Sequence, residues 1–557
     1  MSASAWIRTA LHEGPSEAAW TTLVQNLGAV PPDKLSSVRG LAQRRAGAWP
    51  SELRRAPPRL WASPAPGLEL VRALRVATTS LAELAWDHPR LRQLAHLDVE
   101  LSALGPEAES FFGSVRLSGL SELGLGGPAP LGFELSRVWE NEFPRLRRLR
   151  LRGIDLGAVD LRLPLRVTRA LDELHLESVA GTGAAWDRLS QMLRAEHPSV
   201  LGLNHLGAEE EHVVRLAASE VFARVVSLSL RGLLTDRVAR ALDFSLDTDG
   251  LLELDLSQAR ISDDGLARFF TRGLFPVTES LHLSGLPGGV RLRGLHAGSF
   301  PALRHLDLVE TALAGTAPWM EDPGLLARLQ SLGVNGGPWA DGLADGSMPA
   351  LRYLRVPGVE GPALARLAAA APGLRRLEAP GARPSLGAWA AALHGPQLKH
   401  VDLGGSTGGD DLAALVGRKT LQSLRWEGPR LSRSGWAALA PVMTSLRTLD
   451  VGEAVMAPED VAAWSEGGPR LHRLRWTGPM SDETVNALVG AGTLNGLVDL
   501  QLGRVSEAHA RRLVEASPWL ERIRLRRLEP EAVRRLEASH PLVEWRFEGA
   551  GGYHSGA

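Results

Sequence analysis

The sequence predicts a curved α/β solenoid, with about 20 short parallel strands in a concave sheet and with helices and loops on the convex side. An L-x-x-L-x-L pattern recurs along most of the chain at spacings of about 22 to 29 residues. The chain has 557 residues, too many for one ordinary globular core. Proline often stands two residues before the pattern, where it ends the preceding helix and favours an extended approach to the next strand.

One well-formed repeat shows how the pattern predicts this fold. Residues 251–267, LLELDLSQARISDDGLA, place Leu251, Leu254 and Leu256 at offsets 0, 3 and 5 and enter a helix near Asp263. Side chains alternate along a strand, so offsets 3 and 5 point inward and offsets 2, 4 and 6 point outward. One repeat cannot bury its own apolar face, so we expect neighbouring repeats to stack and their strands to pair in parallel.

The same register can be followed along most of the chain. The first positions of its repeats are Val71, Leu94, Leu120, Leu146, Leu171, Val200, Val225, Leu251, Thr278, Leu303, Leu329, Leu351, Leu374, Leu398, Leu421, Leu446, Leu471, Leu497, Leu520 and Leu542. Strands are spaced about 4.8 Å apart and helices about 10 Å apart, which bends the stack with the sheet on the inner side. Apolar spacing and capping residues predict convex helices at 262–270, 361–372, 410–417, 432–441, 457–466, 481–490, 506–518 and 529–541.

The amino-terminal part differs from the repeats. Residues 4–12, 16–26 and 33–46 have the pattern of three short helices, followed by a proline-rich segment. The first strand of a solenoid would otherwise expose its apolar face, so we interpret residues 1–69 as a helical cap, with an adaptor domain as the alternative. The expected domains are therefore 1–69, the solenoid at 70–547, and a flexible tail at 548–557.

Composition excludes several kinds of chemistry. There is no cysteine, so disulfides, thiolate metal sites and cysteine nucleophiles are absent. The net charge of −1 gives no global field that would attract nucleic acid or a membrane. We find no signal-peptide pattern and no apolar stretch of transmembrane length, and we expect a cytoplasmic protein. The strong preference for arginine over lysine suggests a bacterial source.

These repeats resemble those of leucine-rich-repeat proteins, and the helical repeats late in the chain resemble the ribonuclease-inhibitor-like subclass. The resemblance covers about residues 70 to 547. It implies a recognition module or scaffold that binds protein on its concave face and has no enzymatic activity. The chain departs from the family at the turn asparagine, because Ala259, Thr311, Pro429 and Pro479 occupy that place. We expect the turn amides to be satisfied by water or by neighbouring main chain.

Arginines recur at the outward offsets of the carboxyl-terminal strands and predict a basic ridge on the concave face. These are Arg355, Arg376, Arg425, Arg473, Arg475, Arg522, Arg524 and Arg546. Such a ridge could hold an acidic protein partner. The alternative interpretation is an ordinary solvated surface on which arginine and aspartate of neighbouring strands neutralise one another. Nucleic acid is a less favoured ligand, because exposed aromatic residues are not interleaved with the arginines.

A polar patch is expected on three consecutive strands, at Glu253, Asp255, His282, His305 and Asp307. Histidine and carboxylate at this spacing could form a metal site or an acid–base pair. We favour a simple polar surface, because nothing in the sequence fixes a ligand geometry. We therefore predict no catalytic residues, no metal ligands and no cofactor.

The last strand is a candidate contact surface. Trp426, Trp476 and Trp545 take inward strand positions where leucine normally lies, which predicts core packing. Leu542, Trp545 and Phe547 belong to the final strand, which has no evident cap after it. An uncovered strand edge could be covered by the tail, by a partner or by a second copy of the chain. The alternative function is an adaptor or effector, in which residues 1–69 dock one protein and the solenoid selects another.

Overall fold

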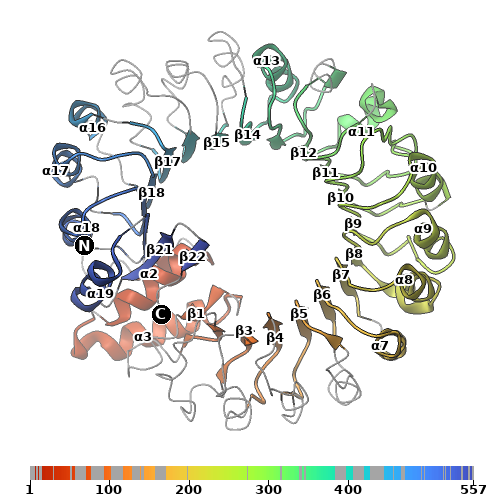
Figure 1. The fold of residues 1–557 in the computed structure, drawn as a ribbon, viewed down its shortest axis with the longest axis horizontal. Helices are drawn as coiled ribbons and strands as arrows, with labels where there is room; N and C mark the ends of the chain where they lie inside the picture. Colours follow the sequence, from red (N-terminus) through yellow and green to blue (C-terminus); the bar gives the residue numbers. More distant parts are fainter. Residues whose placement is uncertain are drawn as a thin grey trace. The chain divides into compact units, whose positions relative to one another are not determined.

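The computed structural model shows short strands separated by helices, turns and loops (Figure 1). It describes residues 7, 10, 11, 15–28, 30–50, 53–56, 70–76, 93–101, 117–127, 138, 143–156, 171–196, 198–272, 274–313, 317–337, 342–343, 346–382, 397–404, 420–426, 445–455, 457–465, 471–490, 492, 494, 496–518, 520, 522–526, 528–540, 543–549 and 552–554. They fall into two units, Met1–Leu251 (unit 1) and Leu252–Gly556 (unit 2).

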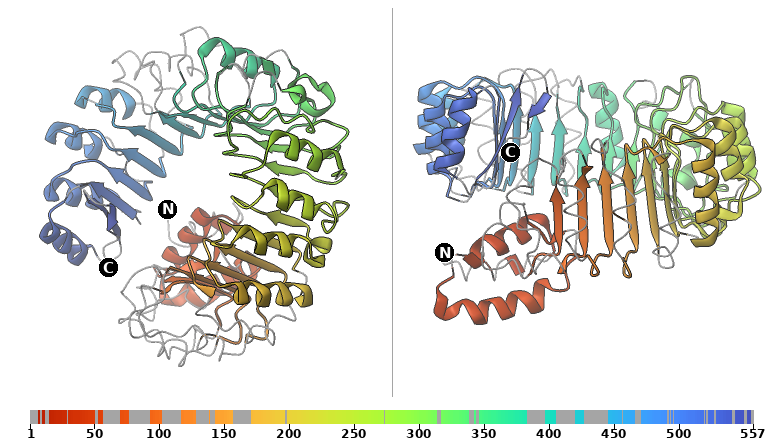
Figure 2. Two further views of the ribbon diagram at one scale, coloured as in Figure 1. Left: turned by 45° about the vertical axis from the view of Figure 1, so that its right-hand side comes forward. Right: turned by 60° about the horizontal axis from the view of Figure 1, so that its bottom comes forward.

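In its described residues, unit 1 contains eight strands, each paired in parallel with the next. Parallel strands of this unit lie side by side in Figure 2. They are β1 (Arg55–Ala56), β2 (Ala73–Val76), β3 (His96–Glu100), β4 (Glu122–Gly126), β5 (Arg148–Arg152), β6 (Glu173–Glu177), β7 (Val200–Asn204) and β8 (Ser227–Ser229). Its described helices are α2 (Glu17–Gly28), α3 (Pro32–Ala46), α7 (Gly183–Glu196), α8 (Glu210–Ala217), the 3-10 helix η9 (Glu220–Arg224) and α9 (Asp236–Leu242).

The described residues of unit 2 follow the same pattern and contain thirteen parallel strands. They are β9 (Glu253–Asp255), β10 (Ser280–His282), β11 (His305–Asp307), β12 (Ser331–Gly333), β13 (Tyr353–Arg355), β14 (Arg376–Glu378), β15 (His400–Leu403), β16 (Ser423–Trp426), β17 (Thr448–Gly452), β18 (Arg473–Trp476), β19 (Asp499–Leu502), β20 (Arg522–Arg526) and β21 (Glu544–Gly549). A last strand, β22 (Gly552–His554), pairs with β21 in the antiparallel sense.

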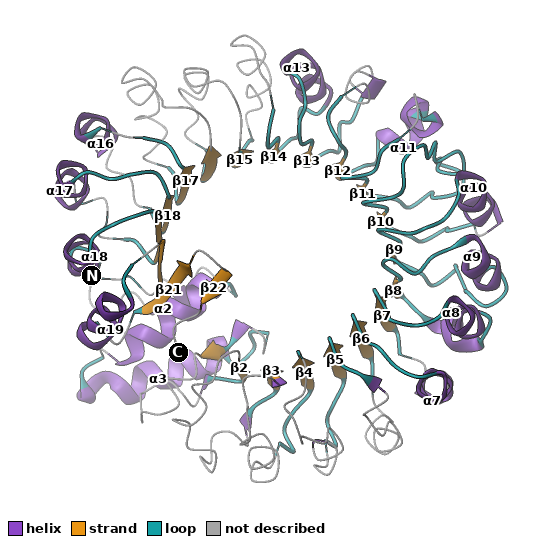
Figure 3. Ribbon diagram, in the orientation of Figure 1, coloured by secondary structure: helices purple, strands orange, loops and turns teal. Residues whose placement is uncertain are grey.

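The helices of unit 2 lie on the side of the sheet that the repeat pattern predicts. They are α10 (Asp263–Arg272), the 3-10 helix η10 (Pro318–Glu321), α11 (Pro323–Leu326), α13 (Gly361–Ala370), α16 (Pro458–Ser465), α17 (Asp482–Gly490), α18 (Glu507–Glu515) and α19 (Pro530–Ser539). Within this unit the strands follow the inner, concave side and the helices the outer, convex side (Figure 3). Unit 2 is thus a curved leucine-rich-repeat solenoid, as predicted.

Most of the helix predictions that can be checked are confirmed within a few residues. α10, α13 and α16 to α19 occupy the predicted ranges, and α2 and α3 match two of the three amino-terminal helices. The predicted helices at 410–417 and 432–441 lie outside the described residues. Of the helix expected at 4–12, residues 7, 10 and 11 are described, and all three are helical.

Inward leucines in register form the core. Leu254 of β9 faces Leu281 of β10, and both are fully buried. Each buried leucine contributes about 1.5–3 kcal/mol relative to an exposed one, so the repeated column supplies the cohesion between repeats. Trp426, Trp476 and Trp545 are also buried at inward positions, which confirms their predicted packing.

Two strand assignments from the sequence need correction. β7 pairs Leu201 with Leu174 of β6, so the first position of that repeat is Pro198 and not Val200. Val200 is an apolar residue of the kind expected at the first position of a repeat, whereas Pro198 is not. This explains why the predicted first position lies two residues too late. In addition, β1 of the expected cap pairs with β2, so parallel pairing begins before residue 70.

The strand-exit turns satisfy their amides without the family's asparagine. The amides of Leu256 and Gln258 donate to main-chain carbonyl oxygens of the next repeat, at 2.8 and 2.7 Å. Thr311 also acts here, because its hydroxyl donates to the Leu283 carbonyl at 2.6 Å and accepts the Leu286 amide at 3.2 Å. Neighbouring main chain therefore fills most of the expected role, with added help from side chains.

Candidate binding surface on the concave face of unit 2

The outward offsets of strands β9 to β21 form two rows of positions across the sheet. Strand register places at offset 2 Glu253, Ser280, His305, Ser331, Tyr353, Arg376, His400, Ser423, Thr448, Arg473, Asp499, Arg522 and Glu544. The offset-4 row holds Asp255, His282, Asp307, Gly333, Arg355, Glu378, Asp402, Arg425, Asp450, Arg475, Gln501, Arg524 and Arg546. These rows are the concave face of unit 2, the surface on which a partner could bind.

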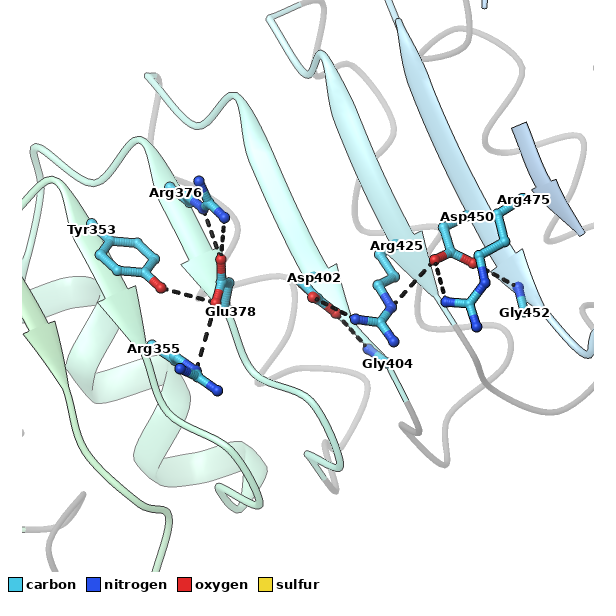
Figure 4. Close-up of polar contacts among 10 residues, drawn as sticks. All are labelled: Tyr353, Arg355, Arg376, Glu378, Asp402, Gly404, Arg425, Asp450, Gly452 and Arg475. Atoms are coloured by element: carbon cyan, nitrogen blue, oxygen red, sulfur yellow. Dashed lines mark hydrogen bonds and ion pairs between the residues drawn. The ribbon is translucent and has the colours of Figure 1, made fainter. Parts of the chain in front are cut away.

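Glu378 organises the part of this face on β13 and β14 (Figure 4). Its carboxylate accepts the Tyr353 hydroxyl at 2.9 Å and the Arg376 Nε at 2.8 Å, and it lies 3.7 Å from Arg355 Nε. The Arg376 guanidinium also lies over the Tyr353 ring, 5.2 Å from the centroid. Burial and the bond to Glu378 raise the pKa of Tyr353 to about 12, so its hydroxyl stays a donor at neutral pH.

Arginine and aspartate alternate across the next four strands. Arg425 lies between two carboxylates, with its Nη1 3.3 Å from Asp402 and its Nε 3.3 Å from Asp450 (Figure 4). Asp450 is shared in turn, because Arg475 Nη1 lies 3.0 Å away on the other side. On β15 to β18 these offset-4 side chains therefore neutralise one another, as expected if the arginines belong to an ordinary solvated surface.

The aspartates of the offset-4 row also accept hydrogen bonds from backbone amides. Asp402 accepts the amide of Gly404 at 2.9 Å, and Asp450 accepts the amide of Gly452 at 3.0 Å. Aspartate side chains commonly fix turns by accepting an amide two residues on. Burial raises the pKa of Asp450 even though Arg475 and the Gly452 amide oppose that rise. Its two oxygens therefore serve the turn and the ion pairs at once.

At the carboxyl-terminal end of the sheet, Asp499 lies between arginines of both neighbouring strands. Asp499 Oδ2 lies 3.2 Å from Arg522 Nη1 and 3.8 Å from Arg524 Nη2, so one acidic oxygen serves two arginines. Arg473 occupies the opposite side of Asp499 in the register, and it makes no ion pair within the part of the chain that the structure describes. Arg524 is therefore held more loosely by its carboxylate than Arg425 and Arg475 are by theirs.

The predicted basic ridge is therefore not uniform. Acidic side chains on the same or a neighbouring strand form ion pairs with Arg355, Arg376, Arg425 and Arg475. Asp499 is shared by Arg522 and Arg524. Arg546 holds its place in the register opposite Arg524, and its side chain lies outside the described residues.

Register brings the predicted polar patch together on β9, β10 and β11. His282 Nε2 lies 3.0 Å from Ser280 Oγ and 3.8 Å from Glu253 Oε1. Its bond to Asp307 is the main cause of its raised pKa, whereas burial lowers the pKa of His305. Asp255 and Asp307 each accept an amide two residues on, at 3.0 and 3.2 Å, and so share the turn role of Asp450.

The patch has no evident metal geometry. Among the described residues, no group of three or more histidine and acidic side chains could hold a metal ion. In the same part of the chain, no helix is both long and apolar enough to cross a membrane. The arrangement that is present consists of hydrogen bonds and ion pairs on an open strand surface.

The three residues predicted to form a contact surface at the last strand differ in what the structure describes of them. Trp545 is buried, and its indole Nε1 donates to the His540 carbonyl at 3.5 Å. Leu542 lies outside the described residues, as does the side chain of Phe547. Strand β22 pairs with β21 at Phe547 to Gly549, so the tail covers part of the edge that the sequence left open.

A charged cluster in unit 1 went unnoticed in the sequence. Glu122 of β4 is buried, and it lies 2.9 Å from His96 Nδ1, 3.6 Å from Arg148 and 3.0 Å from Arg150. These partners lower its pKa against the opposing effect of burial. Arg148 also pairs with Glu173 at 2.8 Å. The signal was available, because these residues occupy the same outward offsets as the ridge in unit 2.

No protein-family model matches the sequence, and no curated protein matches it significantly. Among solved structures, the chain is similar to an internalin (inlF) from Listeria monocytogenes, with 14% identity over 74% of this chain and 88% of that one, at a TM-score of 0.32. It is similar to a leucine-rich-repeat protein of Leptospira interrogans, with 16% identity, coverage of 80% and 98%, and a TM-score of 0.31. The TLR13–ssRNA13 complex gives 13% identity, coverage of 88% and 75%, and a TM-score of 0.42.

The class of fold follows from the chain's own repeats. Parallel strands in strict leucine register, joined through turns and convex helices, define a leucine-rich-repeat solenoid.

Proposed function

We propose that this chain is a recognition scaffold that binds a protein partner on the concave face of unit 2. The observation that carries the proposal is the pair of outward rows on thirteen consecutive strands, whose described members include partly exposed arginines and Tyr353. Extended solenoid surfaces of this kind serve as binding faces. Tyrosine and arginine, which form the Tyr353–Arg376 cluster, are enriched at protein interfaces.

An acidic protein is the partner that the β13 to β21 part of this face fits best. On β13 to β21 the two rows contain eight arginines, at positions 355, 376, 425, 473, 475, 522, 524 and 546, against the five acidic residues Glu378, Asp402, Asp450, Asp499 and Glu544. An excess of positive charge attracts an acidic partner and speeds its association. A bacterial source, the ribonuclease-inhibitor-like subclass and a cytoplasmic location stay predictions of the sequence.

The adaptor alternative would use α2 and α3 as a docking module. In α2, Trp20, Leu23 and Leu27 have almost no exposed surface, and Trp20 packs edge-on against Trp49 at 6.4 Å. In α3, Ala42 and Ala46 are buried, whereas Leu35, Val38 and Leu41 are partly exposed. A docking helix needs a free apolar face. The burial on α2 therefore favours a cap, whereas α3 keeps a partly exposed apolar face; the domain limits 1–69, 70–547 and 548–557 remain our working division.

Site-specific cross-linking tests the proposal. A photoreactive amino acid would replace Ser423, an outward and half-buried residue of β16, or Arg366, an exposed residue on convex helix α13. Full-length protein would be irradiated in an extract of its host. We expect a discrete cross-linked protein from position 423 and none from position 366. The same partner captured only from position 366 would contradict binding on the concave face.

A further inference from the structure

An exposed aromatic side chain in unit 1 lies outside the outward rows of strand positions. Phe244 follows helix α9, and 84% of its surface is exposed, the largest fraction among the large apolar residues that the structure describes. Burying an aromatic side chain is a large source of stability, and the fold obtains little of it from this residue. The ring is therefore available to another molecule.

The turn that carries this ring is held by hydrogen bonds to its own helix and to the preceding repeat. The Phe244 amide donates to the Ala241 carbonyl at 3.3 Å, and the Ser245 amide donates to the Leu242 carbonyl at 3.0 Å. The Ser245 hydroxyl donates to the carbonyl of Ala217 in the preceding repeat. The backbone is therefore fixed before a partner arrives, which lowers the cost of ordering the ring in a complex.

The charge of this turn restricts the kind of partner. Residues 243–250 contain three aspartates, Asp243, Asp247 and Asp249, and no lysine or arginine. Asp247 and Asp249 are exposed, and Asp247 also accepts the Asp249 amide at 3.0 Å. Arg240 precedes the turn and donates its Nε to the main chain of its own helix at 3.1 Å. The aspartates would be repelled by an anionic membrane surface and attracted by lysine and arginine on a protein.

We propose that Phe244 anchors a second protein contact, in which its ring enters an apolar recess that the partner rims with lysine or arginine. Aromatic anchors that fill desolvated pockets supply much of the binding energy of protein interfaces. The aspartates of the turn meet the basic rim, and the rim keeps water away from the ring. This contact is separate from the concave face of unit 2, because Phe244 lies in unit 1 on the turn after α9.

Photo-cross-linking of the full-length protein tests the contact. A photoreactive phenylalanine analogue would replace Phe244 or, as a control, Val455, another exposed apolar residue, which follows β17. After irradiation in an extract of the host, mass spectrometry would identify the captured proteins. We expect a discrete protein from position 244 that position 455 does not capture. The absence of a discrete product, or capture of a second copy of this chain, would overturn the proposal.

Affinity measurements with that purified protein test the chemistry of the contact. Phe244→Ala should weaken binding by at least about 30-fold, as expected for an aromatic anchor at the centre of an interface. The double variant Asp247→Asn, Asp249→Asn keeps an oxygen for the turn amide and should weaken binding by about three- to tenfold at low salt, with a smaller effect at high salt. Parent affinity in either variant would overturn the proposal. Val455→Ala is the matched control and should bind like the parent protein.

Two further measurements separate binding from other roles of the ring. Phe244→Ala should leave the urea midpoint of unfolding unchanged, because the side chain is mostly exposed. A clear fall would overturn the proposal by showing that the ring supports the fold. Vesicles of phosphatidylserine and phosphatidylcholine should not retain the protein, and retention that depends on Phe244 would assign the ring to a membrane instead. If position 244 captures no partner while position 423 still cross-links a protein, this second contact fails and the proposed function stands.

Discussion

Arg475 and Asp450 face each other across strands β18 and β17, with Nη1 3.0 Å from the carboxylate oxygen Oδ2. The other oxygen of Asp450 accepts the amide of Gly452, so one side chain joins a partly buried ion pair to the turn that ends its strand. Asp402 repeats the arrangement with Arg425 and Gly404. The charged row is therefore part of the repeat's architecture as well as its surface.

The turn bond should matter more than the ion pair. Asp450→Asn keeps an oxygen for the Gly452 amide and removes a carboxylate whose pKa is already raised by burial, so we expect a loss below about 1 kcal/mol. Asp450→Ala leaves that amide unsatisfied and should cost about 1–3 kcal/mol. Urea unfolding would measure both, with the exposed loop residue Asp249→Ala as control. Equal losses for the two Asp450 variants would assign the main effect to charge.

Arg54 should hold α3 to the first strands of unit 1. Its side chain is buried and donates to the carbonyls of Leu70 at 2.8 Å and Gly47 at 3.1 Å, while burial and the nearby Arg72 lower its pKa to about 10. Arg54→Ala should cost about 1.5–3 kcal/mol, because both carbonyls lose a charged donor. Amides of α3 and β2 should then exchange faster by about 10- to 150-fold, as measured by hydrogen–deuterium exchange. The exposed Arg45→Ala in α3 is the control, and equal acceleration in both variants would refute this role.

His282 should make stability depend on pH in a defined direction. Its bond to Asp307 raises its pKa above that of the unfolded chain, with Asp255 and Glu253 adding to the shift. Its stabilising contribution is therefore full below about pH 6.5 and is lost as pH rises through the higher folded-state pKa. The advantage of the parent protein over His282→Gln in urea midpoint should shrink between pH 6 and pH 8.

His305→Gln serves as a control, because its stability difference from the parent protein should change with pH in the opposite direction. Burial is the main cause of the lowered pKa of His305, so the charged histidine costs stability at low pH and this cost disappears as pH rises. The advantage of the parent protein over His305→Gln should therefore grow over the same interval. Parallel pH trends for the two variants would contradict the assigned environments of these neighbouring histidines.

Gly333 should position Asp307 by leaving space for it. A Cβ at residue 333 would lie 2.4 Å from Asp307 Oδ1, far inside normal contact distance. Gly333→Ala should push the carboxylate away, weaken its bond to His282 and lower the pKa of His282, which an NMR titration of the histidine ring would measure. Gly490→Ala adds a methyl group with no atom within 4 Å and should leave that pKa unchanged. An unaltered pKa in Gly333→Ala would show that Asp307 does not depend on the glycine.

Much of this architecture could be predicted because strand side chains alternate. Leu254 and Leu281 identify inward positions, and that period places Arg425 and Asp450 outward. The sharing of one carboxylate between two arginines could not be predicted, because it depends on side-chain reach across neighbouring strands. β1 was missed because it has only two residues, and the tail strand β22 because its glycine-rich sequence has no strand pattern.

A structure of the complex obtained with the cross-linked partner tests the central claim most directly. Electron cryo-microscopy of full-length protein joined through position 423 would place the partner on one face of unit 2. We predict partner density over the outward side chains of β13 to β20. Density on the convex helices α16 to α19, with the concave rows left open, would contradict the account.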